Sequence, residues 1–208
     1  MGLKVLGIAA SPRAGGNSDV LLHAALGAAA ESGAATSLVQ LRNAHIAPCV
    51  ECNNCQRTGE CCVQDDYQEI FLSLLETDHV IFSTPIFFMT VSAQAKLLID
   101  RCQCLWSRKY VLHAPVVEPP RDRRGLVIAV GGSKSKRMFD CVQWTMKYWF
   151  DVLDMQYAAN LFVNKVDAKG DVERHPSAMA EARRLGAALV REPKWPAGKP
   201  VNVELFGE

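Results

Sequence analysis

The sequence predicts an α/β protein built on a doubly wound, five-stranded parallel sheet with helices on both faces. Two observations support this fold class. Strand and helix signals alternate along the 208 residues, and most strand segments are continuously apolar, as strands covered on both faces are. The length fits one domain, and 49% hydrophobic with 22% charged residues is ordinary for a globular core.

The expected elements follow one another in strict alternation. Apolar runs predict strands at residues 4–9, 35–41, 79–83, 126–130 and 155–163. Helices are expected at 17–32, 65–76, 92–106, 135–153 and 176–192. The second of these helices begins at two aspartates, whose carboxylates accept first-turn N–H groups and suit the positive end of the helix.

The chain is expected to form one domain over residues 1–192, followed by an extended tail over 193–208. The tail is rich in proline and glycine, and we expect no helix in it. Residues 108–124 combine prolines with basic residues and are expected to be an irregular excursion. The carboxyl ends of the strands then gather the loops at 10–17, 84–92 and 131–139, where ligands bind in such sheets.

The bulk composition excludes several classes of function. A net charge of +1 argues against a nucleic-acid partner or a polybasic membrane surface. No apolar run reaches the length of a membrane span, and the first residues lack the pattern of a secretory signal. Eight cysteines without such a signal indicate a reducing compartment, where clustered cysteines serve metals or catalysis. We therefore expect a cytoplasmic protein with no membrane partner.

The most distinctive pattern is a cysteine loop over residues 48–64, directly after the second strand. Four cysteines in it have the spacing C-x2-C-x2-C-x5-C, namely Cys49, Cys52, Cys55 and Cys61. Thiols in such a polar segment oxidise readily unless something ligates them. Three cysteines at two-residue intervals and a fourth further on are similar to the bacterial ferredoxin pattern for a [4Fe–4S] cluster.

Zinc and free or disulfide-forming thiols remain open as alternatives at this loop. Structural zinc sites usually split their ligands into two separated pairs, whereas one continuous loop can wrap around a larger cluster. Cys62 is adjacent to Cys61, so the fourth ligand is ambiguous by one residue; we expect Cys61, because Gly59 allows a turn that brings it inward. The remaining cysteines, at positions 102, 104 and 141, are expected in the core.

The loop between the first strand and the first helix predicts a phosphate site. Its candidate residues are Ser11, Arg13, Gly16, Asn17 and Ser18. Hydroxyl, amide and guanidinium groups donate hydrogen bonds, and glycine lets backbone N–H groups approach an anion at a helix N-terminus. The loop matches neither the dinucleotide nor the triphosphate motif, so a single terminal monophosphate fits best. An ordinary glycine turn with a helix cap is the alternative.

Two further loops predict the rest of a cofactor site. The loop after the third strand is apolar where a surface loop should be polar, and it begins Pro85-Ile86-Phe87-Phe88. Such a loop suits a flat aromatic ligand, although packing of these side chains into the core or an interface is an equal alternative. The glycine turn Gly131-Gly132-Ser133 follows the fourth strand, where plain strand-to-helix punctuation also explains it.

In this order the motifs resemble a known family. Ser11-Pro12-Arg13, Gly16-Asn17-Ser18, the cysteine loop running into Asp65-Asp66, Thr84 to Phe88, and Lys96 with Asp100-Arg101 are similar to the iron–sulfur flavoproteins of the NADPH-dependent FMN reductase group. The resemblance covers residues 3 to about 165. It implies a flavodoxin-like fold with strand order 2-1-3-4-5.

The resemblance also implies the cofactors and the assembly. FMN would place its phosphate on residues 11–18 and its ring between the loops at 85–88 and 131–134. A [4Fe–4S] cluster would sit on the four cysteines, in a homo-oligomer (dimer or tetramer) where a cluster approaches a neighbouring subunit's flavin. The chain departs from the pattern at Phe87, where many relatives carry Tyr.

These expectations describe an FMN-dependent oxidoreductase that passes electrons between a two-electron donor and one-electron partners. A flavin exchanges one or two electrons and a cluster exchanges one, so the pair would join NAD(P)H or a similar donor to a ferredoxin-like carrier. No side chain is expected to act as a catalytic acid or base. An NAD(P)H-dependent FMN or quinone reductase without a cluster is one alternative. A zinc-stabilised or thiol-based redox-sensing regulatory protein is the other.

Overall fold

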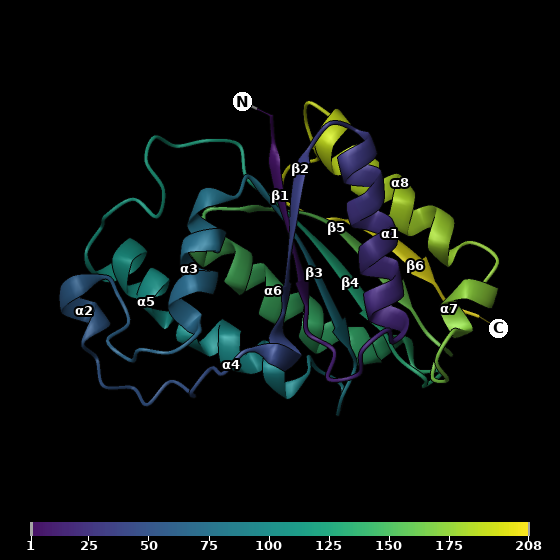
Figure 1. Cartoon of the computed structure of the whole chain (residues 1–208), viewed down its shortest axis with the longest axis horizontal. Helices are drawn as coiled ribbons and strands as arrows, with labels where there is room; N and C mark the ends of the chain where they lie inside the picture. Colours follow the sequence, from purple (N-terminus) through teal and green to yellow (C-terminus); the bar gives the residue numbers. More distant parts are fainter. Residues whose placement is uncertain (1, 208) are drawn as a thin grey trace.

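A computed structural model describes residues 2–207 and shows a six-stranded parallel sheet in the order β2-β1-β3-β4-β5-β6 (Figure 1). The strands are β1 Lys4–Ala9, β2 Ala35–Gln40, β3 His79–Pro85, β4 Arg124–Val130, β5 Gln156–Val163 and β6 Val201–Leu205. The predicted α/β class and the order 2-1-3-4-5 are confirmed. The sheet differs from the prediction by one additional strand at its edge.

The additional strand β6 lies within the segment predicted as an extended tail. It pairs in parallel with β5, with Ala159 opposite Val201 and Val163 opposite Leu205. Its sequence Val-Asn-Val-Glu-Leu alternates apolar and polar residues, and the burial alternates with it. This period-two pattern is typical of an edge strand with one covered face, and it explains why the segment pairs rather than remaining free.

Helices cover both faces of the sheet, as predicted (Figure 1). One face carries α1 Asn17–Glu31, α7 Asp171–Arg174 and α8 Ala178–Arg191. The other carries α3 Tyr67–Glu76, α4 Ala93–Arg101, α5 Gln103–Trp106 and α6 Asp140–Val152. Helices α1 and α8 pack so closely that a Cβ atom on Gly186 would lie 2.1 Å from the carbonyl oxygen of Ala25.

Two expected helices are interrupted. The helix expected at 92–106 breaks at Cys102, where ψ of 3° leaves the helical region, and separates into α4 and α5. A π-helical turn Ser107–Val111 then continues into the segment expected to be irregular. The helix expected at 135–153 begins as a 3-10 turn, Lys136–Phe139, before α6. Three short elements were not predicted: a 3-10 turn Leu41–Asn43, the helix α2 Cys55–Thr58 within the cysteine loop, and the helix α7 Asp171–Arg174.

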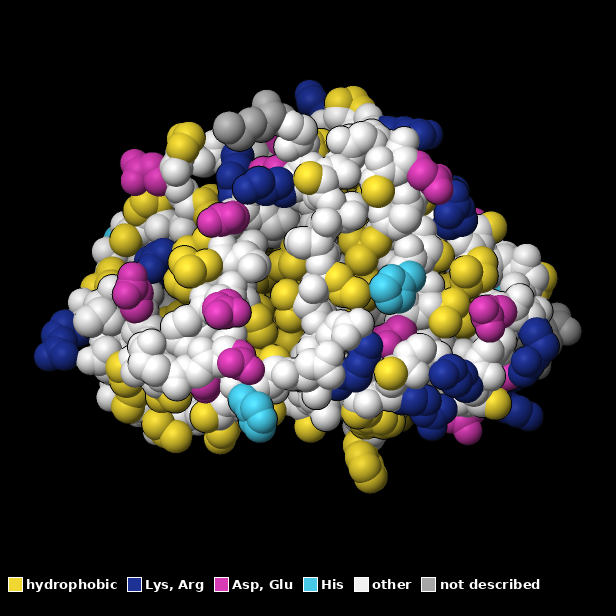
Figure 2. Space-filling view, in the orientation of Figure 1, with side chains coloured by type: hydrophobic (Ala, Val, Ile, Leu, Met, Phe, Trp, Pro, Cys, Tyr) yellow, Lys and Arg dark blue, Asp and Glu magenta, His cyan; other side chains and the backbone are white. Residues whose placement is uncertain are grey.

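The outer surface is mixed in charge. Figure 2 shows Lys and Arg side chains interspersed with Asp and Glu over the face that it draws. Across residues 2–207, no helix is both long enough and apolar enough to cross a membrane.

Candidate functional site

The start of helix α1, where the sequence predicts a phosphate site, has no side-chain cap. Its N-cap residue, Gly16, contributes no side-chain hydrogen bond to the first turn. The first-turn N–H groups of a helix have no partner within the helix, and they carry the positive end of its dipole. Ser11 shapes the approach, because its hydroxyl accepts a hydrogen bond from the N–H of Arg13 at 3.1 Å. The predicted phosphate loop therefore has the geometry of a helix N-terminal anion site.

Asn17 has a role that the sequence did not reveal. Its Nδ2 donates to the carbonyl of Ala168 at 2.9 Å, and its Oδ1 accepts from the N–H of Val172 at 3.4 Å. The sequence predicts the Asn17 amide as a donor to a phosphate. In the structure it ties the loop after β5 to the start of α1, so it builds one wall of the site.

Sequence reasoning also missed a buried ion pair under the phosphate loop. Asp19 is 2% exposed; its Oδ2 accepts from the N–H of Gly15 at 3.1 Å and from Nη1 of Arg42 at 2.8 Å. The Asp19 carboxylate stabilises the turn of the loop through its bond to Gly15, and Arg42 compensates its charge. An acidic residue in the first turn of a helix was the available signal, but its arginine partner lies on a different element.

The loop after β3 is fixed at both ends. Ser92 caps α4 by accepting from the N–H of Ala95 at 3.2 Å, and its hydroxyl donates to the carbonyl of Ala10 at 2.6 Å. The bond to Ala10 joins the end of the loop after β3 to the end of β1, from which the phosphate loop begins.

The tip of this loop is a tight turn. Phe87 and Thr90 exchange backbone hydrogen bonds of 3.0 and 3.1 Å. The two central residues, Phe88 and Met89, have φ of 48° and 65°, a left-handed conformation that costs about 1–2 kcal/mol per non-glycine residue. Phe88 consequently projects away from the molecule, fully exposed.

The glycine turn after β4 owes its glycines to close packing. A Cβ atom on Gly131 would lie 2.8 Å from Sδ of Met138, and one on Gly132 would lie 3.0 Å from Cβ of Asp167. This packing is compatible with a ligand-binding turn and with the plain strand-to-helix punctuation that the sequence left as an alternative. Ser133 lies beyond the turn, where its hydroxyl accepts from the N–H of Ser135 at 3.1 Å.

The three loops enclose one cavity of about 160 Å³ at the carboxyl ends of β1, β3 and β4. Ten of the twelve predicted cofactor residues line it: Ser11, Arg13, Gly16, Asn17, Ser18, Pro85, Ile86, Phe87, Gly131 and Gly132. Phe88 and Ser133 lie outside its lining. Pro12, which belongs to the predicted phosphate loop, also lines it; Val130, Val166 and Asp167 complete the lining, and the sequence did not point to these three. The cavity has donors for an anion at the α1 end and apolar side chains at the β3 end.

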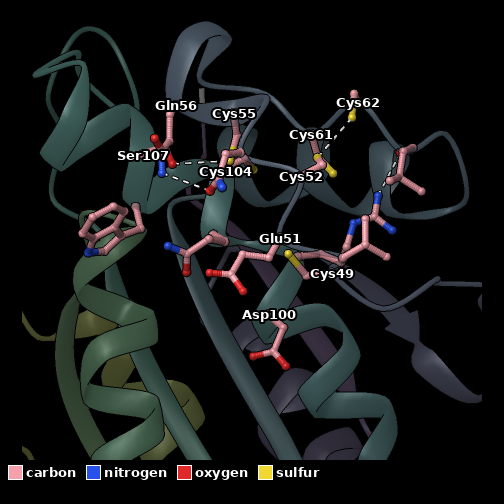
Figure 3. A pocket seen from close by; sticks show the side chains of 16 residues that line it. Cys49, Glu51, Cys52, Cys55, Gln56, Cys61, Cys62, Asp100, Cys104 and Ser107 are labelled. Atoms are coloured by element: carbon pink, nitrogen blue, oxygen red, sulfur yellow. Dashed lines mark hydrogen bonds between the residues drawn. The ribbon is translucent and has the colours of Figure 1, made fainter.

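The cysteine loop encloses a second, larger cavity of about 520 Å³ (Figure 3). All four predicted ligand residues line it, and so does Cys62. The left-handed conformation of Gly59, with φ of 71°, ends α2 and turns the chain back toward the cavity, as predicted. The two cavities share no lining residue, so the loop leads away from the phosphate site although it follows β2.

The thiols occupy different environments around this cavity. Figure 3 shows the contact of Cys52 with Cys62, at 3.6 Å between sulfurs, separate from that of Cys55 Sγ with Ser107 Oγ, at 3.3 Å. The backbone N–H of Asn54 and the thiol of Cys62 lower the pKa of Cys52. Cys61 is half-buried, and Cys62 is exposed. These thiols are spread along the lining: within residues 2–207, no three His, Cys, Asp or Glu side chains could hold one metal ion between them.

Cys102 and Cys104 are buried, as predicted, but Cys141 is exposed on α6. The prediction of a core position for Cys141 is wrong, because it lies on the outer face of that amphipathic helix. Cys104 also lines the cysteine cavity. Burial raises the pKa of both buried thiols, that of Cys102 to about 12, so they stay protonated near neutral pH.

The sheet order and the loops gathered at its strand ends define a flavodoxin-like α/β protein. Residues 3–169 match the family model of NADPH-dependent FMN reductases, and the chain belongs to this family. The family is named for the reduction of FMN with NADPH.

Two curated relatives are iron–sulfur flavoproteins. One, from Methanocaldococcus jannaschii, is 37% identical over 133 residues, which is 64% of each chain. The other, from Methanosarcina thermophila, is 32% identical over 133 residues, 64% of this chain and 65% of the relative. The matched segment thus spans a little less than two thirds of these relatives. A solved azoreductase from Bacillus anthracis str. Sterne has the same fold, with a TM-score of 0.67, 16% identity and coverage of 89% of this chain and 99% of the other.

Proposed function

We propose that this protein is an FMN- and [4Fe–4S]-containing electron carrier that joins a two-electron donor to one-electron partners. The observation that carries the proposal is the thiol-lined cavity of about 520 Å³, which lies in the same chain as the family's cofactor cavity and shares no residue with it. Relatives at 32–37% identity that are named iron–sulfur flavoproteins support it.

The first cavity fits FMN by its chemistry. The phosphate would lie at the uncapped start of α1, where Arg13 adds a charged donor and Ser11 shapes the turn. The flat ring would lie between Pro85–Phe87 and Gly131-Gly132, where a Cβ atom on either glycine would already meet a neighbour. Asn17 would contribute by holding the loop after β5 against this site.

The second cavity fits a cluster better than a single ion. Tetrahedral zinc needs four ligand atoms about 2.3 Å from one point, whereas the described thiols are spread along a wide cavity. Cys49, Cys52, Cys55 and Cys61 would be the ligands, as their ferredoxin-like spacing predicts. The interactions that lower the pKa of Cys52, chiefly the backbone N–H of Asn54, favour the thiolate that an iron ligand requires.

The bound cofactors would supply the redox chemistry, the flavin exchanging one or two electrons and the cluster one. The protein binds, separates and shields them. NAD(P)H or a ferredoxin-like carrier would be the partner. Because the two cavities are separate within one chain, we propose a homo-oligomer, dimer or tetramer, in which the cysteine loop of one subunit faces the flavin of another. Phe87 lines the first cavity and Trp106 lines the cysteine cavity, while Phe88 follows Phe87 in the chain and lies outside both linings. All three aromatic side chains are exposed, which supports such an interface.

The decisive experiment is chemical analysis of protein purified without oxygen. We expect one FMN, about four iron atoms and about four acid-labile sulfides per subunit, with a brown colour and a broad absorbance shoulder. FMN without iron or sulfide would favour the alternative of an NAD(P)H-dependent FMN or quinone reductase that has no cluster. Zinc in place of iron would favour the zinc-stabilised alternative, and either result would overturn the proposal.

A further inference from the structure

Arg101, the last residue of α4, joins the two ends of the cysteine loop. Its Nη1 donates to the carbonyl of Ala47, before the first cysteine, at 3.0 Å. Its Nη2 donates to the carbonyl of Val63, after the last cysteine, at 2.9 Å. The side chain has no solvent exposure, and it lies in the lining of the cysteine cavity. One guanidinium therefore closes the loop around the cavity.

The charge of Arg101 is partly compensated and firmly oriented. Asp65 accepts from its Nη1 at 2.5 Å, and the same carboxylate oxygen accepts from the N–H of Ala47 at 2.9 Å. The guanidinium also stacks over the ring of Tyr67, 4.6 Å from its centroid. These contacts fix the plane of the guanidinium, so that its Nε–H group has a defined position.

The Nε–H donor of Arg101 is unused. Nε of Arg101 is buried and has no hydrogen-bond partner among the described residues. Burial lowers the pKa of Arg101, but its interactions with Asp65 and with the thiol of Cys61 outweigh this and raise it. A buried N–H without an acceptor is destabilising, so a group of this kind calls for an explanation, such as a partner that the chain itself does not supply.

We propose that Arg101 is the positioning residue of the cysteine loop, and that its fixed charge beside Cys61 raises the reduction potential of the centre that the thiols hold. This inference rests on the proposed function for the nature of that centre. Its first half, the closing of the loop, concerns the protein alone.

The direction of the effect follows from charge. Reduction of the centre by one electron, supplied by dithionite in the test below, adds one negative charge to a unit that its thiolates already make anionic. A buried positive charge stabilises the reduced form more than the oxidised form, and hydrogen bonds to cluster sulfurs act in the same direction. Asp65 opposes it from the other side of the guanidinium.

Four variants separate the effect of the positive charge of Arg101 from the effect of its bidentate hydrogen bonds. Arg101→Gln removes the charge, and Arg101→Lys keeps the charge but loses the bidentate geometry. Asp65→Asn removes the opposing charge. Arg57→Gln is the matched control, because Arg57 is an exposed arginine of the same loop. FMN content shows that each variant is folded, since the flavin cavity shares no residue with the cysteine cavity.

The first readout is the midpoint potential of the iron–sulfur signal in a dithionite titration of the purified holoprotein. Arg101→Gln should lower the ratio of reduced to oxidised centre at least tenfold at a fixed potential, which is about 59 mV for a one-electron couple. Asp65→Asn should shift the potential upward, and Arg101→Lys and Arg57→Gln should stay near the wild type. A potential unchanged in Arg101→Gln, or moving the same way in Asp65→Asn, overturns the proposed charge effect.

The second readout needs no iron. In iron-free protein we expect iodoacetamide to label Cys61 slowly in the wild type and in Arg57→Gln, and at least tenfold faster in Arg101→Lys and Arg101→Gln, because the loop is no longer closed. Equal rates would overturn the positioning role. A wild type that binds no iron would instead refute the proposed function, and this second readout would still decide whether Arg101 holds the loop.

Discussion

The phenol oxygen of Tyr67 lies 3.1 Å from Sγ of Cys104 and 3.8 Å from Sγ of Cys102, so one hydroxyl serves two buried thiols. Burial raises the pKa of Tyr67 well above its usual value, and the hydroxyl stays neutral. Cys104 lines the cysteine cavity, and we call the three side chains together the floor of that cavity. These three side chains are polar and neutral, with the Arg101 guanidinium stacked on the Tyr67 ring beside them.

Tyr67→Phe should lower the free energy of unfolding by about 1 kcal/mol, because two buried thiols lose their hydroxyl partner while the ring remains. Urea denaturation measures the change. Tyr148→Phe is the matched control: Tyr148 is 63% exposed, and we expect a change below about 0.5 kcal/mol. A Tyr67 variant as stable as the wild type would show that the hydroxyl contributes nothing to the floor.

Arg13→Ala should weaken FMN binding about 10- to 150-fold, since a charge-assisted hydrogen bond contributes roughly 1.5–3 kcal/mol. Fluorescence titration of flavin-free protein with FMN measures this. Riboflavin, which lacks the phosphate, should bind the wild type and the variant equally. Arg137→Ala, at a side chain 88% exposed, should leave FMN affinity unchanged. Equal loss of riboflavin and FMN would place Arg13 away from the phosphate.

Cys61→Ser should remove most of the bound iron, whereas Cys62→Ser should leave iron and FMN nearly unchanged. Cys61 is half-buried and lies beside the Arg101 guanidinium, while Cys62 is exposed on the rim next to Cys52. Iron per subunit after anaerobic reconstitution decides between them. If Cys62→Ser loses the iron and Cys61→Ser keeps it, the assignment of the fourth ligand is wrong.

Two helical glycines should respond to alanine in opposite directions. Gly27 in α1 has nothing within 4 Å of an added Cβ, so Gly27→Ala should raise the free energy of unfolding by up to about 1 kcal/mol. Gly186→Ala should lower it by at least about 1–3 kcal/mol, because the new atom meets the backbone of Ala25. Thermal and urea unfolding of both variants test this. Similar effects at both sites would contradict the close packing of α1 on α8.

His79 should make stability depend on pH. Burial and the nearby charge of Arg124 lower its pKa below the ordinary 6.5. The unfolded chain therefore binds more protons than the folded one as pH falls below about 6.5, and stability is lost there until pH passes the folded value. Urea denaturation between pH 7.5 and about 5 should show this loss. His79→Gln should flatten the curve in this window, and a curve of unchanged slope would exclude His79 as the cause.

The sequence predicted the elements that depend on local pattern. Apolar strands followed by Gly-, Ser- or Pro-containing loops located ten of the fourteen residues that line the first cavity, and cysteine spacing located the second cavity. The residues that it missed act across long separations. Asp19 pairs with Arg42 and Asp65 with Arg101, and neither partner can be deduced from one segment. Phe88 faces outward because a left-handed turn reverses its direction, and apolar character alone does not signal that.

The bond from Asn17 to Ala168 joins residues 151 positions apart and dictates when the flavin site becomes complete. Synthesis proceeds from the N-terminus, so the phosphate loop leaves the ribosome long before the wall that Asn17 secures. Strand β5 must also be in place, because that wall follows it directly. A nascent chain stalled before residue 168 would therefore have the phosphate loop but no closed cavity, and FMN, bound there as proposed, would load only at the end of biosynthesis.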